Sequence, residues 1–188
     1  WAYAKDNPDE AAGIVLENGG QDENHQKRMM GEVAKLLGDA REALNRDDFD
    51  AAESALAKAD RGRLSDFEKA QVERLRGYVA YGRQDNAKAI EHLSAAAAME
   101  ALRPSDQEDM LFQIAQIQGV EKRWKDVIAT LQRWFKIVEK PNSVGYYLMA
   151  LSWFQLENYD AGVGPAEQAI ELAEKPQQSW LQLLLAIQ

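Results

Sequence analysis

The sequence predicts an all-α chain built from pairs of helices, and three observations support this prediction. From about His25 to the last residue, apolar side chains recur at steps of three and four residues, as they do on one face of a helix. Turn-forming residues interrupt this periodicity at regular intervals. Alternation with the period of a strand is nearly absent, and Thr130 is the only threonine.

The first part of the chain differs from the rest in composition. Residues 1–24 hold six acidic residues and one basic residue, together with Pro8, Gly13 and a Gly19-Gly20 pair. Turn formers and acids at this density predict a poorly ordered or extended lead-in. We expect the first helix to begin near His25 and to end at the run Asn45-Arg46-Asp47-Asp48.

The helices that follow are expected in pairs. Asp47 or Asp48 is suited to cap the second helix of the first pair, which carries Phe49 and Leu56 on its apolar face. The further helices are expected over residues 65–82 with 86–99, 105–120 with 124–138, 143–156 with 159–173, and a single helix from 177. Breakers separate them at Gly62, Asp85-Asn86, Pro104-Ser105, Pro141-Asn142 and Pro176.

The second helices of the pairs align on one phase. Equivalent places are taken by Phe49, Asn86, Trp124 and Tyr159. On this phase the repeats cover residues 33–69, 70–107, 108–142 and 143–176, with a truncated fifth over 177–188, inside a repeat domain of residues 25–188. Steps that converge on about 34 residues are typical of a helix-turn-helix repeat.

Residues 26–188 resemble the tetratricopeptide repeat (TPR) family. The clearest copy of the motif runs from Ser143 to Glu174 and includes Tyr146, Ala150, Trp153, Tyr159 and Ala169, with a delayed Pro176. The second copy matches at Gly77, Ala89, Ile90, Leu93 and Ala96. In the third copy Gln118 replaces the aromatic residue and Trp134 replaces the small one. The resemblance implies an α-solenoid with a right-handed superhelix.

Composition and charge exclude several classes of partner and site. The chain has 188 residues, a net charge of −9 and no cysteine, so disulfides, thiolate metal sites and thiol catalysis are ruled out. The acidic excess lies at the two ends, which indicates solubility or, alternatively, attraction of a basic partner. We expect no nucleic-acid partner and no insertion into a membrane, because basic clusters and long apolar runs are absent from the sequence. The chain begins at Trp1, so we expect that an upstream segment has been removed.

The sequence gives few signs of catalysis. His25 and His92 are the only histidines, and neither has the spacing of a metal ligand pair. The acidic run at Asp47–Asp50 lacks the twelve-residue ligand pattern of a calcium loop, and helix capping explains it better. We therefore expect no enzymatic activity, no catalytic residue, no metal and no cofactor.

The TPR resemblance implies that first helices line a concave face and bind a partner polypeptide there. The predicted partner-binding residues on that face are Arg74, Tyr78, Tyr81, Phe112, Gln116, Tyr147, Leu151 and Phe154. Aromatic side chains of this kind dominate many binding surfaces, although the same residues could fill the space between helices. Of the basic residues that clamp a C-terminal carboxylate in the family, only Arg74 has a counterpart, so we expect an apolar or extended peptide.

The last helix is strongly apolar for the end of an array. It carries Trp180, Leu181, Leu183, Leu184 and Ile187. We interpret this surface as a broken interior that a following helix would cover, because repeat arrays need a polar outer cap. The alternative is a docking surface, including one for self-association.

Residues 134–188 also resemble the TPR proteins encoded beside the bacterial TonB–ExbB–ExbD machinery. The segments concerned are Val138–Pro141, Tyr147–Phe154 and Glu174–Leu184. This resemblance implies a periplasmic accessory protein of TonB-dependent uptake that contacts a TonB, ExbB or ExbD component. The alternatives are a general assembly or secretion adaptor, a cytoplasmic location, or a module of a larger protein with a catalytic domain elsewhere.

Overall fold

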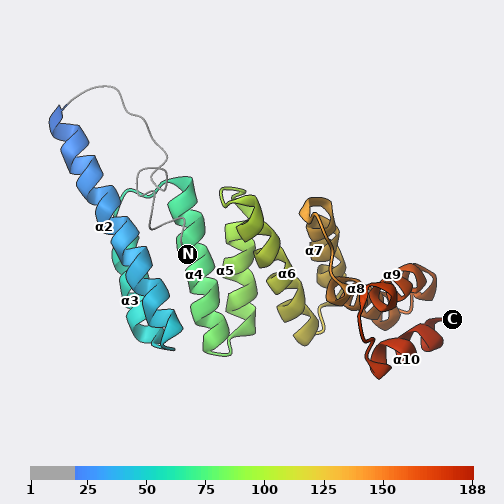
Figure 1. Cartoon of the computed structure of the whole chain (residues 1–188). Helices are drawn as coiled ribbons and strands as arrows, with labels where there is room; N and C mark the ends of the chain where they lie inside the picture. The colour runs from blue at the N-terminus through green and yellow to red at the C-terminus, as the bar shows by residue number, and fades with distance from the viewer. Residues whose placement is uncertain (1–19) are drawn as a thin grey trace.

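The computed structural model describes the backbone of residues 20–188 and the side chains of residues 30–188. Within this range the prediction of an all-α chain is confirmed, because the described residues form helices and no strand. The helices are α2 (Gly20–Asn45), α3 (Phe49–Ala59), α4 (Asp66–Gly82), α5 (Asn86–Ala98), α6 (Pro104–Val120), α7 (Trp124–Ile137), α8 (Ser143–Gln155), α9 (Tyr159–Leu172) and α10 (Gln178–Ile187). They follow one another in a row from α2 to α10 (Figure 1).

Helix α2 begins earlier than the sequence led us to expect. Its first residue is Gly20, whereas the expected start was near His25, so the end of the predicted lead-in is helical. The rest of that lead-in, residues 1–19, lies outside the described residues. Figure 1 shows the first turns of α2 extending beyond its partner α3, which has 11 residues against 26 in α2.

The same short turn joins the two helices of each of four pairs. Its middle residue has a φ between 57° and 62° in every case, at Asp47, Gln84, Lys122 and Glu157. The amide of the next residue donates a hydrogen bond of 2.9–3.0 Å to the carbonyl five residues earlier, at Asp48, Asp85, Arg123 and Asn158. These bonds satisfy carbonyls that the end of a helix leaves open. The chain therefore repeats one backbone device four times, at steps of 37, 38 and 35 residues.

The turn also starts the following helix. Side-chain oxygens of Asp48, Asp85 and Asn158 accept a hydrogen bond from the amide three residues later, at 3.0, 3.1 and 3.4 Å. Arg123 occupies the equivalent place before α7 without a side-chain cap. The short acidic run at Asp47–Asp50 is thus accounted for by one left-handed residue and one cap.

The joints between pairs are less uniform than the turns within them. After α3 and α5 the first residue, Asp60 or Met99, keeps a helical ψ of −23° or −21°. After α7 and α9 the first residue, Val138 or Ala173, is extended, with a ψ of 129° or 125°. The backbone conformation directly after the second helix therefore differs between the first two pairs and the last two pairs.

Small buried residues let the two helices of a pair approach each other. They occupy equivalent places in successive first helices, at Ala40, Gly77, Ala115 and Ala150. The contact is closest at Gly77, where an added Cβ would lie 2.5 Å from Cγ of the fully buried Leu93. Each pair thus depends on a position that has room for little more than a hydrogen or a methyl group.

The third pair keeps this small residue but differs from the other pairs at Gln118 and Trp134. Trp134 is 2% exposed, and its six-membered ring lies where a Cβ on Gly145 of α8 would be, 2.5 Å from that position. Gln118, which replaces the expected aromatic residue, accepts a buried hydrogen bond of 2.8 Å from Thr130 of α7. The large indole therefore fits because the third residue of the next helix is Gly145, and the buried amide is paired.

The interpretation of the last helix as an uncovered interior is wrong for most of its apolar residues. Trp180, Leu183 and Ile187 are 6–7% exposed, because α10 lays them against α8 and α9. The Trp180 ring stacks on Tyr147 with a centroid distance of 4.9 Å. The outward face of α10 keeps Leu181 and Leu185 exposed. None of the helices within residues 20–188 is long and apolar enough to cross a membrane.

Candidate functional site

The first helices of the pairs lie on the inner side of the row. Cα atoms of α2 and α4, of α6 and α8, and of α8 and α10 come within 8 Å of each other. Among the described helices, successive second helices (α3 and α5, α5 and α7, α7 and α9) do not approach so closely. At these three steps the first helices are closer together than the second helices, so the row curves toward the first helices and their face is the concave one there.

The step from α4 to α6 differs from the other steps between first helices. The Cα atoms of these two first helices do not come within 8 Å, although both contact α5, which lies between them. Side chains alone connect α4 with α6 at this point.

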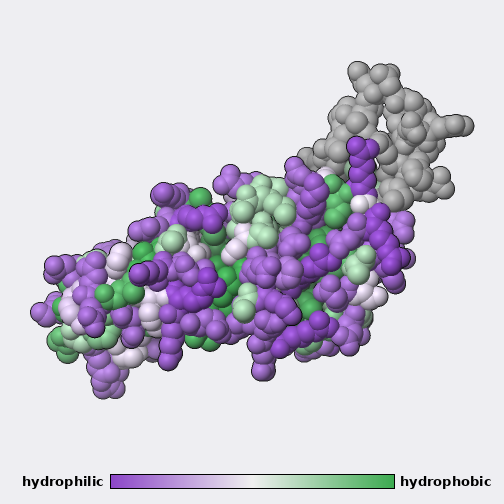
Figure 2. Space-filling model, turned by 180° about the vertical axis from the view of Figure 1, so that it is seen from behind, coloured by the Kyte–Doolittle hydropathy of each residue, from purple (hydrophilic) through white to green (hydrophobic). Residues whose placement is uncertain are grey.

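Two of the predicted partner-binding residues are openly accessible. Tyr81 near the end of α4 is 51% exposed, and Gln116 of α6 is also exposed. Figure 2 shows that hydrophilic side chains divide the hydrophobic surface on the face it presents into separate small areas. An exposed tyrosine such as Tyr81 offers contact area together with a hydroxyl group.

Four other predicted residues are largely occupied by packing. Phe112 lies against Trp134, with ring centroids 4.9 Å apart. Tyr147 is covered by Trp180 of α10, while Leu151 and Phe154 pack around the buried cluster that Ala150 and Leu183 help to form. These four side chains are half-buried, so they expose only part of their surface on the concave face.

The remaining two predicted residues, Arg74 and Tyr78, interact with each other. Nε of Arg74 donates a hydrogen bond of 2.9 Å to the Tyr78 hydroxyl, and its guanidinium carbon lies 5.6 Å from the centre of the Tyr78 ring. Because they stand four residues apart on α4, they project from the same side of that helix. Arg74 is thereby held in a fixed direction toward α6.

Arg74 belongs to a polar cluster that connects α2, α4 and α6. Its guanidinium forms an ion pair of 2.9 Å with Asp106, which also accepts a 2.9 Å hydrogen bond from Nε of Arg103. On the other side, the Arg41 guanidinium donates a 3.2 Å hydrogen bond to the amide oxygen of the buried Gln71. We call Arg41, Gln71, Arg74, Tyr78, Arg103 and Asp106 the arginine cluster.

The charges in the arginine cluster are unbalanced. The cluster holds three guanidinium groups and one carboxylate: Arg74 and Arg103 pair with Asp106, and Arg41 makes no ion pair among the described residues. Burial lowers the pKa of Arg41, and repulsion from the Arg74 charge lowers it further. Burial opposes ionisation of Asp106, but bonds from Arg103 and Arg74 outweigh it and hold its pKa below the usual value. The cluster therefore has two positive charges in excess, in a chain that is acidic as a whole.

The pKa of Asp106 leads to a prediction about stability. A carboxyl group whose pKa is lowered by folding contributes stability above its unfolded pKa of about 3.9, and this contribution is lost as the pH falls through the folded value. Asp106→Asn is therefore expected to lower the free energy of unfolding by up to about 1 kcal/mol at pH 7, the size typical of partly exposed ion pairs. Urea unfolding at pH 7 and near pH 2.5 measures the effect, which should shrink at the lower pH.

Asp126→Asn is the control for this prediction. Asp126 also accepts a bond from an arginine three residues earlier, Arg123, at 2.7 Å, but on the exposed surface of α7. A loss for Asp106→Asn that is no larger than the loss for Asp126→Asn, or that does not change with pH, would contradict the argument.

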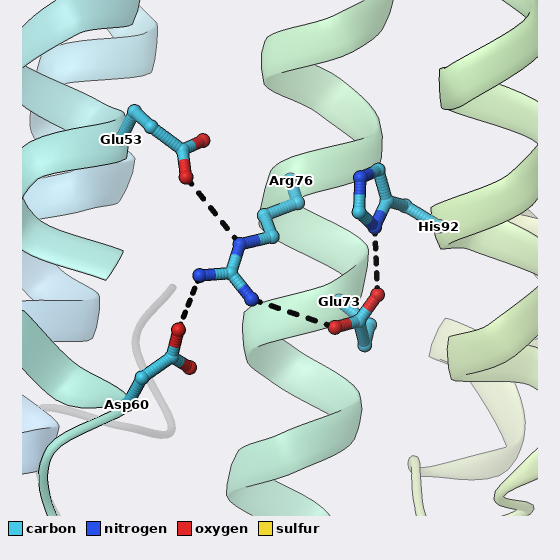
Figure 3. A network of polar contacts seen from close by, with 5 residues as sticks. All are labelled: Glu53, Asp60, Glu73, Arg76 and His92. Carbon is cyan, nitrogen blue, oxygen red and sulfur yellow. Dashed lines mark hydrogen bonds and ion pairs between the residues drawn. The ribbon is translucent and has the colours of Figure 1, made fainter. Parts of the chain in front are cut away.

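A second ionic network joins α3, α4 and α5. Arg76 lies between Glu53 at 3.5 Å, Glu73 at 3.6 Å and a closer Asp60, while Glu73 is 2.7 Å from Nδ1 of His92 (Figure 3). Burial lowers the pKa of Arg76, but its three carboxylate partners outweigh this and raise it. Here the arginine has three carboxylate partners, in contrast to Arg41, and the network connects two helix pairs.

No arrangement of catalytic type stands out in the described part of the chain. No group of three or more His, Cys, Asp or Glu side chains there could hold a metal ion. A shallow hollow between α2 and α3 is lined by Leu36, Asp39, Glu42, Ser54 and Lys58, among others, and contains no histidine. His92 is engaged with Glu73 rather than with a nucleophile.

Sequence reasoning missed most of the arginine cluster. It selected Arg74 and Tyr78 but not Arg41, Arg103 or Asp106, because these residues occupy different places in their repeats and Arg103 lies in a loop. The only signal available was the presence of basic residues near the start of one repeat and the end of another. A comparison of the sequence with protein-family models and with curated proteins gives no match.

Proposed function

We propose that this chain is a non-catalytic scaffold of the TPR type, an α-solenoid that holds a partner polypeptide on its concave face. The observation that carries this proposal is the fourfold repetition of one turn, with the same left-handed residue and the same hydrogen bond. A small residue at the equivalent place of each first helix adds to it. Arrays of such units form extended surfaces, which suits them to binding other chains.

The concave face supports binding of an extended segment rather than a compact domain. Its accessible groups, among them Tyr81, Gln116 and Arg103, come from different segments of the chain. An extended peptide reaches separate side chains of this kind with successive residues, and its own backbone groups stay hydrated or bond to polar side chains.

The experiment begins with affinity capture on the full chain, followed by mass spectrometry of the retained proteins. The affinity of the captured partner is then measured by titration calorimetry for Tyr81→Ala and Tyr159→Ala. Tyr81 is on first helix α4 and Tyr159 on second helix α9, and both are about half exposed, at 51% and 43%. We expect Tyr81→Ala to weaken binding by about 1–3 kcal/mol and Tyr159→Ala to leave it unchanged.

Equal effects of the two substitutions would contradict binding on the concave face. Circular dichroism provides the control for folding, since neither side chain belongs to the buried core. Tyr78, Phe112 and Tyr147 are less suitable test positions, because removing them also removes packing or hydrogen bonds inside the array.

We further propose that the scaffold acts in the bacterial periplasm as an accessory to TonB-dependent uptake. The support for this is the resemblance of residues 134–188 to TPR proteins encoded beside TonB, ExbB and ExbD. Capture of a TonB, ExbB or ExbD component by the full chain would agree with it. Capture of a component of another assembly or secretion machine would favour the adaptor alternative.

A further inference from the structure

Arg41 is the one half-buried arginine in the described part of the molecule that forms no ion pair there. Its guanidinium is half-buried, and its hydrogen-bond partner is the neutral amide of Gln71 at 3.2 Å. Withdrawing a cation from water costs free energy that an opposite charge normally offsets. The other two half-buried arginines, Arg74 and Arg76, both have such carboxylate partners. The exception at Arg41 needs an explanation.

The neighbours of Arg41 increase this cost. Arg74 and Arg103 both repel its charge, and the one carboxylate that attracts it, Asp106, is already bound by those two arginines. A buried cation without an opposite charge, and with like charges beside it, raises the free energy of the unbound protein. Binding of an anion lowers that free energy. Guanidinium groups suit carboxylates in particular, because two parallel N–H groups meet the two oxygens.

The position of the cluster gives the anion a route of entry. Arg41 comes from α2, Arg74 from α4, and Arg103 from the loop before α6, so the cluster lies across the step where the Cα atoms of α4 and α6 do not come within 8 Å. Tyr78 fixes the direction of Arg74, and Gln71 fixes that of Arg41, so the two side chains are ordered before a ligand binds. Such preorganisation reduces the entropy lost on binding.

We propose that the arginine cluster is an anion site that receives a carboxylate of the partner polypeptide, with Arg41 as its principal contact. This inference rests on the proposed scaffold function and adds the chemistry of the bound segment: it carries an acidic group that reaches the space between α2, α4 and α6. Asp106 keeps Arg74 and Arg103 in place, and the incoming carboxylate pairs with Arg41.

The test uses the full chain and a library of random twelve-residue peptides. Each peptide is displayed inside a carrier protein, so that neither of its ends is free. Selection is carried out against the unchanged protein, Arg41→Gln and the control Arg46→Gln. Arg46 is on the same helix but pairs with Glu42 at 2.5 Å on the exposed surface. We expect the unchanged protein and Arg46→Gln to enrich peptides with Asp or Glu at one position, and Arg41→Gln to lose that enrichment while keeping the apolar positions.

Synthetic peptides then identify the source of the carboxylate. The selected peptide is compared, by titration calorimetry, with its Glu→Gln form and with a form that has a free C-terminus and no acidic side chain. Arg41→Gln should weaken the acidic peptide about tenfold to a hundredfold and leave the Glu→Gln peptide unchanged. If only the peptide with a free terminus binds in an Arg41-dependent way, the carboxylate is the C-terminal one.

The outcomes separate the two proposals. Peptides selected without acidic preference, or an acidic preference that survives Arg41→Gln, would overturn the anion site and leave the scaffold function standing. Selection of no peptide at all would overturn both. Arg41→Lys keeps the charge but not the paired N–H groups, so an intermediate affinity for the acidic peptide would support direct contact over a loss of folding.

Discussion

Replacing Trp134 by alanine is expected to lower the free energy of unfolding by about 3–5 kcal/mol, the largest effect of any single substitution we predict. The indole is almost fully buried, and its ring lies 4.9 Å from that of Phe112 and 5.0 Å from that of Phe135. Its removal leaves a cavity between α7 and α8 that the helices cannot close without moving. Urea unfolding followed by circular dichroism measures the loss.

Trp124→Ala is the control for this substitution. Trp124 is on the same helix but at its first residue and only half-buried, so its loss should cost clearly less. The contact with Gly145 provides a second check. Gly145→Ala should be destabilising alone and close to neutral in the Trp134→Ala background, because the added methyl group then enters the cavity. Independent effects of the two substitutions would contradict the proposed fit.

Gly77→Ala is expected to destabilise the chain by about 1–3 kcal/mol, although alanine is the better helix former. The new Cβ would lie 2.5 Å from Cγ and 2.6 Å from Cδ2 of Leu93, whose side chain is fully buried and has no room to withdraw. Helices α4 and α5 must therefore separate. The midpoint of urea unfolding should fall, with little change in helical content at zero urea.

Gly38→Ala is the matched control in the same kind of element. Gly38 is exposed within α2, and a Cβ there would meet no atom within 4 Å. Its replacement should stabilise the chain by about 0.5–1 kcal/mol through helix propensity alone. If both substitutions change stability in the same direction, contact between the paired helices does not decide the effect at Gly77.

The helix boundaries were predictable because they depend on local signals. Helices α3, α5, α7 and α9 begin at Phe49, Asn86, Trp124 and Tyr159, the four positions that the sequence places in phase. Capping residues and breakers lie within a few residues of the boundary they set, so a single sequence contains the information. The start of α2 was missed because its first turn, at Gly20–Glu23, consists of glycine and polar residues that favour a loop on composition.

The candidate site was only partly predictable, because it depends on contacts between distant segments. Periodicity placed Tyr147 on an open face of its helix, but Trp180, 33 residues later, covers it. Likewise nothing near Arg41 in the sequence indicates that Arg74 and Arg103 will surround it. The periodicity of a sequence predicts the side of the helix on which a residue lies. Whether another helix buries that side depends on how the pairs pack against each other.

The difference between the turns and the joints decides where this molecule can change shape. The turns within pairs are identical and each is closed by its own hydrogen bonds, so an alteration there damages one pair. The joints after Asp60, Met99, Val138 and Ala173 adopt two backbone conformations and set the direction of everything that follows them. A rotation of a few degrees at Met99 displaces all the helices that follow, α6 to α10, and the displacement grows with distance from Met99. Small backbone adjustments at the joints therefore tune the curvature of the row, and with it the spacing between chemical groups that a ligand would have to span.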